Sequence, residues 1–284
     1  MKTLLSLLIT MSVLVGCQGS RSATPALSNM SSYSLHDISY GKDTAQRMDV
    51  YLPAGRNMST TKVLVLIHGG GWNGGSKSDF ASYIEAFRKR IPDYAIFNIN
   101  YRLVNEKQLF PAQENDVKAA LDFVASKAME YGINRNKVVL LGASAGAHLA
   151  LLQAYKYPQP QVKAVIDFFG PTDLVSMYNK PWHPLVPIAL QMITGAKLSE
   201  NPKIYEQSSP THFVSAQSPP TLILHGGKDN IVAPWQSKEL KNALDSAGVA
   251  NELIIYPNEH HGWYGTTLSK SFNEIKTFLD KEVR

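Results

Sequence analysis

Six apolar runs, each four to eight residues long, recur along the chain between glycine, proline or polar segments. Continuous runs of this length are typical of strands buried on both faces of a parallel sheet. Between them, apolar residues recur at three- and four-residue intervals over residues 117–124 and 268–279, as on one face of a helix. The alternation predicts an α/β fold with a mostly parallel sheet. The predicted strands are 63–68, 95–99, 138–141, 162–169, 221–224 and 253–256.

Two segments depart from this rhythm. Residues 33–52 alternate apolar and polar positions around a Gly-Lys-Asp turn, which predicts an antiparallel hairpin leading into the domain. Residues 171–220 are rich in proline and contain only one short apolar helical piece, 185–193. Long irregular stretches inside a domain are usually lids or binding loops. We therefore interpret 171–220 as a lid insertion within a catalytic domain that covers residues 33–284.

Composition narrows the class of protein. The 284 residues are 44% hydrophobic and 18% charged, which suits a globular protein with a sizeable core. The formal net charge of +5 is spread along the chain, without a block of Lys or Arg or a basic-aromatic pattern. We therefore expect no nucleic-acid partner.

The N-terminus has the pattern of a secretory signal. Lys2 precedes an apolar run over residues 4–15, too short for a comfortable membrane span. Residues 14–17, Leu-Val-Gly-Cys, resemble the bacterial lipobox, in which cleavage falls before the cysteine and the cysteine sulfur carries a diacylglyceryl group. We expect a signal peptide over 1–16, a lipid on Cys17 and a serine-rich tether over 17–32, with the protein membrane-anchored in the bacterial cell envelope. Ordinary signal cleavage, with Cys17 incidental, is the alternative.

The segment Gly142-Ala-Ser-Ala-Gly146 falls where a predicted strand ends and an Ala/Leu-rich helical run begins. A G-x-S-x-G sequence in that context is typical of a nucleophile elbow, a sharp turn that lifts the serine hydroxyl above the sheet edge. Ser144 is therefore the candidate nucleophile.

A serine nucleophile needs a base and a carboxylate that orients the base. Asp229 follows the strand at 221–224, and His261 follows the last strand and precedes a glycine. The order Ser, Asp, His is that of α/β-hydrolases. Asp173, and less so Asp167, are rivals for the acid. The remaining candidates are treated as bystanders: His68, His148, His183, His212, His225 and His260.

A third motif, His-Gly-Gly-Gly-Trp at 68–72, directly follows the strand at 63–68. Consecutive glycines let backbone N–H groups approach a reacting carbonyl, so Gly69 and Gly70, with Ala145 after the nucleophile, are the candidate oxyanion donors. No Lys-Ser or Lys-Thr follows the glycines, which argues against a phosphate loop, and the H-E-x-x-H zinc motif is absent. We expect neither a metal nor a cofactor.

With HGGGW at 68–72, GASAGAHLA at 142–150, GGKDNIV at 226–232 and HHGW at 260–263, the chain resembles the α/β-hydrolase esterases of the hormone-sensitive-lipase-like and feruloyl-esterase-like groups. The resemblance covers about residues 40–284. It implies a sheet of about eight strands, cofactor-free hydrolysis of small or medium carboxylic esters, and the roles given above.

The region before the first glycine motif is short, so we expect no counterpart of the large N-terminal cap helices of many hormone-sensitive-lipase relatives. Substrate selection is then expected to depend on residues 171–220 and on Trp72, our candidate substrate-binding residue. Kynurenine formamidase-like enzymes share an HGG-x-W loop and the triad, so an arylformamidase acting on formyl amides is a rival. A rival of another class is a non-catalytic binding lipoprotein on the same fold.

Overall fold

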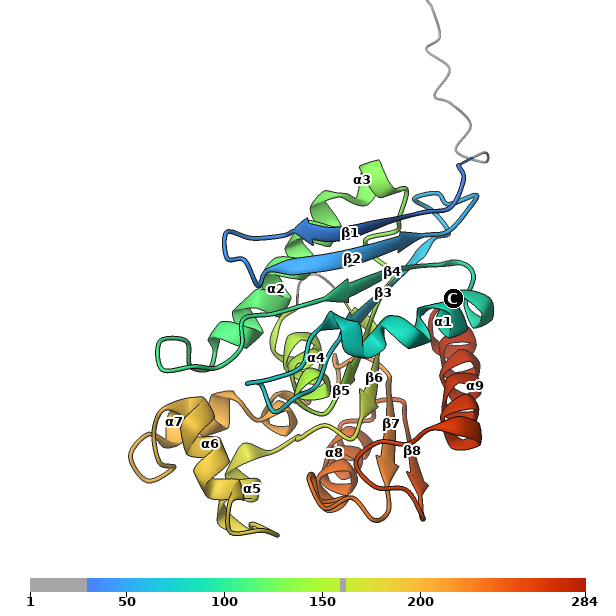
Figure 1. Cartoon of the computed structure of the whole chain (residues 1–284). Helices are drawn as coiled ribbons and strands as arrows, with labels where there is room; N and C mark the ends of the chain where they lie inside the picture. Colours follow the sequence, from blue (N-terminus) through green and yellow to red (C-terminus); the bar gives the residue numbers. More distant parts are fainter. Residues whose placement is uncertain (1–29, 159–161) are drawn as a thin grey trace, which may run out of the picture.

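An eight-stranded sheet runs through the domain in the computed structural model, which describes residues 30–158 and 162–284 (Figure 1). The strand order is β1-β2-β4-β3-β5-β6-β7-β8. β1 pairs antiparallel with β2, and β2 antiparallel with β4, whereas all later neighbours are parallel. The strands are β1 (Tyr33–Ser39), β2 (Arg47–Leu52), β3 (Lys62–Ile67), β4 (Tyr94–Ile99), β5 (Val138–Ala143), β6 (Val162–Phe168), β7 (Thr221–Gly226) and β8 (Asn251–Tyr256).

Helices cover both faces of this sheet (Figure 1). The 3₁₀ helix η2 with α1 and α9 packs on one face, and α2, α4 and α8 pack on the other. The helices are η2 (Lys77–Tyr83), α1 (Ile84–Arg90), α2 (Ala112–Ser126), α3 (Ala128–Tyr131), α4 (Ala145–Lys156), α5 (Leu174–Asn179), α6 (Val186–Thr194), α7 (Pro202–Gln207), η3 (Pro210–Phe213), α8 (Trp235–Ser246) and α9 (Gly265–Glu282).

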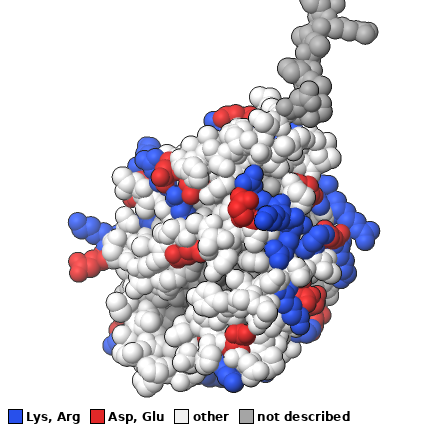
Figure 2. Space-filling model, turned by 45° about the vertical axis from the view of Figure 1, so that its right-hand side comes forward, with Lys and Arg blue, Asp and Glu red and all other residues white. Residues whose placement is uncertain are grey.

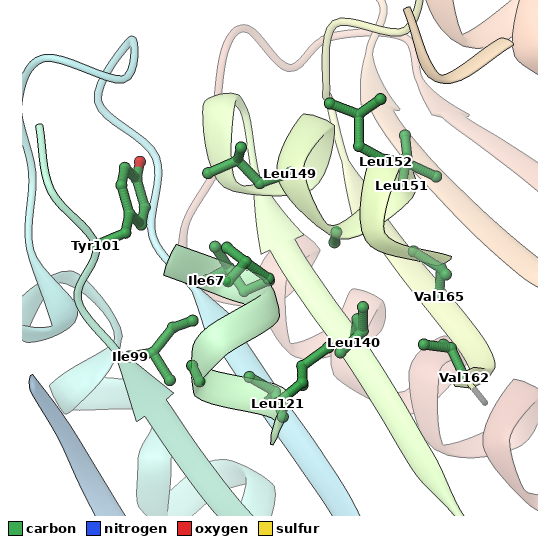
Figure 3. Close-up of a cluster of buried hydrophobic side chains, with 14 of the residues drawn as sticks. Ile67, Ile99, Tyr101, Leu121, Leu140, Leu149, Leu151, Leu152, Val162 and Val165 are labelled. Atoms are coloured by element: carbon green, nitrogen blue, oxygen red, sulfur yellow. The ribbon is translucent and has the colours of Figure 1, made fainter. Parts of the chain in front are cut away.

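Side-chain alternation along β3 explains why both faces are apolar. Val65 and Ile67 belong to the core on the α2 and α4 face, whereas Leu64 and Leu66 belong to the core on the α1 and α9 face. Figure 3 shows the first core, where Ile67, Leu140 of β5, Leu121 of α2 and Leu149 of α4 come together. β5, which is buried from Val138 to Gly142, therefore supports the turn that follows it.

The predicted fold is confirmed: the six predicted strands and the antiparallel hairpin are present, and the sheet has eight strands. The segment 171–220 is more helical than its sequence indicates. The apolar piece at 185–193 forms α6, but α5, α7 and η3 also lie in this segment. Each has only four to six residues, fewer than two turns, so the sequence shows no helical period there.

The predicted signal peptide, Cys17 and most of the tether lie outside the described residues. Within residues 30–158 and 162–284, no helix combines the length and the apolar character needed to cross a membrane. Figure 2 shows Lys and Arg side chains gathered toward the right of one face, with acidic side chains among them. The last turn of α1, residues 88–90, is entirely basic, which suits the negative end of the helix dipole.

Candidate active site

Ser144 occupies a sharp turn between β5 and α4. Its backbone angles, φ 53° and ψ −119°, lie outside the regions that residues with a side chain ordinarily adopt. A Cβ on Gly142 would lie 2.3 Å from the carbonyl carbon of Gly146, and a Cβ on Gly146 would lie 2.0 Å from the carbonyl oxygen of Ile67. The turn therefore requires both glycines, and it has the nucleophile-elbow geometry predicted from the sequence.

The three side chains predicted for catalysis lie in hydrogen-bond contact, although they come from the loops after β5, β7 and β8. His261 Nε2 is 2.9 Å from Ser144 Oγ, and His261 Nδ1 is 2.7 Å from Asp229 Oδ2. A carboxylate can only accept, so His261 Nδ1 carries the proton and Nε2 accepts from the serine hydroxyl. The ring of His261 also packs against that of Phe169, with 4.6 Å between the centroids.

The side chain of Asp229 is buried, and both of its carboxylate oxygens accept hydrogen bonds. Its Oδ1 accepts the backbone N–H groups of Ile231, at 2.8 Å, and Val232, at 2.9 Å. Burial raises the pKa of Asp229, but hydrogen bonds from His225 and His261, together with the Val232 amide, outweigh it and hold the pKa well below its usual value. The carboxylate is therefore ionised and fixed toward His261.

His225 is a site residue that the sequence analysis treated as a bystander. Its fully buried ring places Nε2 3.2 Å from Asp229 Oδ2 and 2.9 Å from the carbonyl oxygen of Val232. Both neighbours are acceptors, so Nε2 is the donor, and Nδ1 accepts from the Ser237 hydroxyl at 2.6 Å. The sequence did contain a signal for this role, since His225 lies near the end of a buried strand and four residues before the candidate acid.

The glycine loop at 68–72 lies against the nucleophile. A Cβ on Gly69 would be 2.8 Å from the carbonyl oxygen of Ala143 and 3.4 Å from Ser144 Cβ, and Gly70 has φ +102°. Among the described residues, the amide N–H groups of Gly69, Gly70 and Ala145 have no hydrogen-bond acceptor. All three predicted donors thus remain available to a ligand beside Ser144.

Trp72 ends this loop in a left-handed conformation, φ 62°, and its ring is buried. The indole N–H donates to His148 Nδ1 at 3.2 Å, and His148 Nε2 lies 2.7 Å from the carbonyl oxygen of Ser208 in the 171–220 segment. Burial lowers the pKa of His148 to about 4, so the ring is neutral and accepts from Trp72 while donating to Ser208. His148, also treated as a bystander from the sequence, thus joins the glycine loop to the insertion.

Ser144 opens into a pocket of about 630 Å³ with a largely apolar wall. Residues 69–73 form one side, and the 171–220 segment forms another. The pocket-lining residues from that segment include Met177, Trp182, Val186, Leu190 and Ile193. Trp72 also lines the pocket. The insertion therefore bounds the candidate site, as a lid would.

The rival acids lie elsewhere. Asp173 caps the N-terminus of α5, accepting from the Ser176 backbone N–H at 2.9 Å, and lies 3.6 Å from His212. Asp167 is fully buried within β6, and its Oδ1 accepts the Gly170 N–H at 2.7 Å. No hydrogen bond joins either residue to His261 among the described residues, which leaves Asp229 as the carboxylate at the site.

The remaining histidines stay outside the chain of hydrogen bonds at Ser144. His68 stacks on Tyr101, with ring centroids 4.3 Å apart, and contacts the Gly69 carbonyl through Nδ1.

Across residues 30–158 and 162–284, no group of three or more His, Cys, Asp or Glu side chains is arranged to hold a metal ion.

Comparison with known proteins identifies the family. Residues 48–244 match the family model BD-FAE. Esterase LipQ of Mycobacterium tuberculosis is 29% identical over 244 residues, which cover 80% of this chain and 56% of that protein. The chain thus spans little more than half the length of this relative.

Solved structures of two esterases are among those similar to the chain. A truncated form of a carbohydrate esterase from gut microbiota has a TM-score of 0.74 and 27% identity, covering 87% of this chain and 97% of that one. An esterase from Thermogutta terrifontis, solved with butyrate bound and also phosphonylated by sarin, has a TM-score of 0.73 in the sarin form, with 25% identity over 86% of this chain and 93% of that one. The resemblance predicted from the four motifs is confirmed, and the chain belongs to the BD-FAE family of α/β-hydrolases.

Proposed function

We propose that the protein is a carboxylic ester hydrolase that acts through an acyl-enzyme intermediate on Ser144. The observation that carries this proposal is the unbroken chain of hydrogen bonds from Ser144 through His261 to the ionised Asp229. A binding protein has no need of a strained serine joined to a histidine and a carboxylate, whereas acyl transfer needs all three.

In the first half of the reaction, Ser144 Oγ attacks the ester carbonyl while His261 Nε2 takes the hydroxyl proton. The carbonyl oxygen becomes an oxyanion that the free amides of Gly69, Gly70 and Ala145 stabilise. As the carbon–oxygen bond to the alcohol breaks, His261 Nε2 returns the proton to the departing oxygen. Asp229 stays ionised throughout and stabilises the imidazolium.

In the second half, water takes the place of the alcohol beside His261. His261 Nε2 accepts a proton from that water, the hydroxide adds to the acyl carbon, and the proton then passes to Ser144 Oγ as the acid leaves. The balance is one ester and one water converted to one acid and one alcohol. No metal or cofactor takes part in this scheme.

Pocket dimensions and charge support small or medium esters without a negatively charged group as substrates. The volume of about 630 Å³ accommodates an acyl chain of several carbons. The pocket lining contains no Lys or Arg that would pair with an anionic substrate, and it includes one carboxylate, Asp79, which would repel one. Apolar side chains of the insertion line this space, so we assign the acyl chain to it. We also assign Trp72 a role in substrate binding, as part of the pocket wall.

The proposal is tested with p-nitrophenyl butyrate in rapid-mixing experiments. Wild-type protein is expected to release a burst of p-nitrophenol followed by slower turnover, because p-nitrophenol leaves during acylation and hydrolysis of the accumulated acyl-enzyme is the slower step. Replacing Ser144 or His261 with Ala is expected to lower kcat by about 10⁶, and Asp229→Ala by about 10⁴. Preferred turnover of an N-formyl aryl amide would instead favour an arylformamidase.

We also propose that a lipid on Cys17 anchors the protein to a membrane of the bacterial cell envelope. The support is sequence alone: the apolar run before Leu14-Val-Gly-Cys17 and the absence of a second cysteine. Labelling of cells with clickable palmitate is expected to mark the wild-type protein and not Cys17→Ser. Equal labelling of both proteins, or labelling of neither, would contradict the anchor.

A further inference from the structure

A second pocket adjoins the Ser144 pocket and shares Ala143, Phe169 and His261 with it. Its volume is about 200 Å³. The rest of its wall comes from the α1 and α9 face of the sheet, including Phe80, Tyr83, Phe87, Trp263, Leu268 and Phe272. We call this space the aromatic pocket. None of the residues assigned to catalysis in the preceding section, other than His261, lines it.

The wall of the aromatic pocket selects an uncharged, apolar group. Apart from His261, its lining contains no ionisable residue other than the tyrosines Tyr83 and Tyr264, and Tyr264 is 79% exposed. The indole N–H of Trp263 is already donated to the Ser271 hydroxyl at 2.8 Å, so it offers no hydrogen bond to a ligand. A sugar, with several hydroxyl groups, would leave most of them unpaired against this wall.

The volume of the aromatic pocket further restricts the groups that it can bind. A protein cavity of about 150 Å³ is enough to hold benzene. The aromatic pocket is slightly larger and therefore admits one six-membered ring with a short linker, but not a fused polycyclic group. Aromatic side chains on several sides allow edge-to-face contacts with such a ring.

The position of the pocket identifies which half of an ester it receives. During acylation the carbonyl oxygen lies at the amides of Gly69 and Gly70, while the departing oxygen must lie within reach of His261 Nε2, which protonates it. The two ends of the reacting centre thus point toward different walls. The aromatic pocket is bounded by His261 and by none of the residues of the glycine loop, whereas the larger pocket contains that loop.

We propose that the aromatic pocket binds the alcohol portion of the ester and selects alcohols that carry one apolar six-membered ring, such as benzyl alcohol. This inference rests on the proposed ester hydrolysis. The ring sits among Phe80, Tyr83 and Phe272, and its linker oxygen lies at His261 Nε2. When the acyl carbon–oxygen bond breaks, the electron pair stays on that oxygen and the His261 proton neutralises it, so a neutral alcohol leaves.

The two-pocket assignment is tested with paired ratios of kcat/KM. The alcohol ratio compares benzyl butyrate with ethyl butyrate, whose alcohols are similar leaving groups, and the acyl ratio compares ethyl hexanoate with ethyl acetate. Wild-type protein is expected to have an alcohol ratio of about 10 or more, because burying an added apolar group in a pocket raises kcat/KM by at least that factor. Leu268→Trp fills the aromatic pocket, so the alcohol ratio is expected to fall about tenfold with little change in the acyl ratio.

Val186→Trp is the matched control, because Val186 lines only the larger of these two pockets. It is expected to lower the acyl ratio and to leave the alcohol ratio near its wild-type value. Thermal melting shows whether each variant folds. If Leu268→Trp does not fold, Leu268→Ala enlarges the aromatic pocket instead, and the kcat/KM ratio for 2-naphthylmethyl over benzyl butyrate is expected to rise.

Three outcomes would overturn the inference. An alcohol ratio near one in wild-type protein would mean that no ring is selected, and a Leu268→Trp variant that changes the acyl ratio instead would place the acyl chain in the aromatic pocket. Preference for the 6-O-butyryl ester of methyl glucoside over benzyl butyrate would make the alcohol a sugar. Failure of the proposed function is distinct, since wild-type protein would then hydrolyse none of these esters.

Discussion

His225 donates to the same carboxylate oxygen of Asp229 that accepts from His261, with its Nε2 3.2 Å from Oδ2. The contact helps to hold the Asp229 carboxylate in place and contributes to the low pKa of that carboxyl group. His225 therefore acts on Ser144 only through Asp229 and His261, as a positioning residue.

His225→Phe removes this donor, so the pKa of Asp229 is expected to rise. A raised pKa leaves Asp229 protonated at a higher pH, so the part of the acid limb of the kcat/KM profile that comes from protonation of Asp229 is expected to move upward. We expect kcat to fall by about 10- to 100-fold, less than for loss of Asp229 itself. His225→Gln, which can still donate, is expected to recover most of the acid limb. An unshifted limb in His225→Phe would refute the positioning role.

His148 and Trp72 make a second testable pair, because their hydrogen bond joins the glycine loop to the insertion. His148→Phe and Trp72→Phe are each expected to lower kcat about tenfold, since displaced oxyanion donors act in the transition state. Little change in KM is expected, because Phe at position 72 keeps an aromatic ring in the pocket wall. The double variant is expected to be no worse than His148→Phe, because all three variants lose the Trp72–His148 hydrogen bond and His148→Phe already lacks the contact to Ser208. Additive losses would show that the two side chains act independently.

The buried carboxyl group of Asp167 is expected to make the free energy of unfolding depend on pH. Burial raises its pKa from an ordinary 3.8 to about 7, against the hydrogen bond from Gly170, and Oδ2 has no partner among the described residues. The folded protein therefore holds a proton that the unfolded chain releases, so its stability falls as pH rises between these two values. Asp167→Asn keeps the acceptor for Gly170 and cannot ionise.

The free energy of unfolding of Asp167→Asn is thus expected to exceed that of the wild type by on the order of 2–4 kcal/mol at about pH 8, and to approach it near pH 4. Urea unfolding at both pH values measures the difference. The same offset at both pH values would show that Asp167 is not protonated in the folded state.

The packing at the nucleophile turn is tested by comparing Gly146→Ala, beside Ser144, with Gly248→Ala, which lies after α8 and serves as the control. Gly248 has φ +70° with no atom within 4 Å of its missing Cβ, so Gly248→Ala meets only backbone strain, about 1–2 kcal/mol. A Cβ on Gly146 would strike the Ile67 carbonyl oxygen. Gly146→Ala is therefore expected to lower the melting temperature far more, or to yield no soluble protein. Similar melting temperatures for the two variants would contradict the packing described at the turn.

Much of the fold and of the candidate site could be predicted from the sequence because the determining signals are local. Apolar runs mark β3, β5 and β7, and each candidate side chain lies in the loop that follows a strand, within five residues of its end. Parallel strands therefore bring Ser144, Asp229 and His261 to one sheet edge. The elbow can be recognised as a sequence motif because the turn leaves no room for a Cβ at Gly142 or Gly146.

Other features depend on contacts between distant segments and leave no periodic signal. His148 joins two segments because the carbonyl oxygen of Ser208, 60 residues away, accepts its hydrogen bond, and nothing near His148 in the sequence indicates that partner. α5 and α7 are too short for a helical period. The aromatic pocket draws its wall from residues 80–87, 143, 168–169 and 261–272, which meet only in the folded protein.

Formation of a covalent adduct on Ser144 tests the central claim most directly. After reaction with a fluorophosphonate ester, intact-protein mass spectrometry and peptide mapping are expected to find one adduct per chain, on Ser144, with activity lost in proportion. His261→Ala is expected to react far more slowly, because the serine then lacks its base. An adduct on another residue, or full hydrolytic activity in a protein whose Ser144 is modified, would contradict the account.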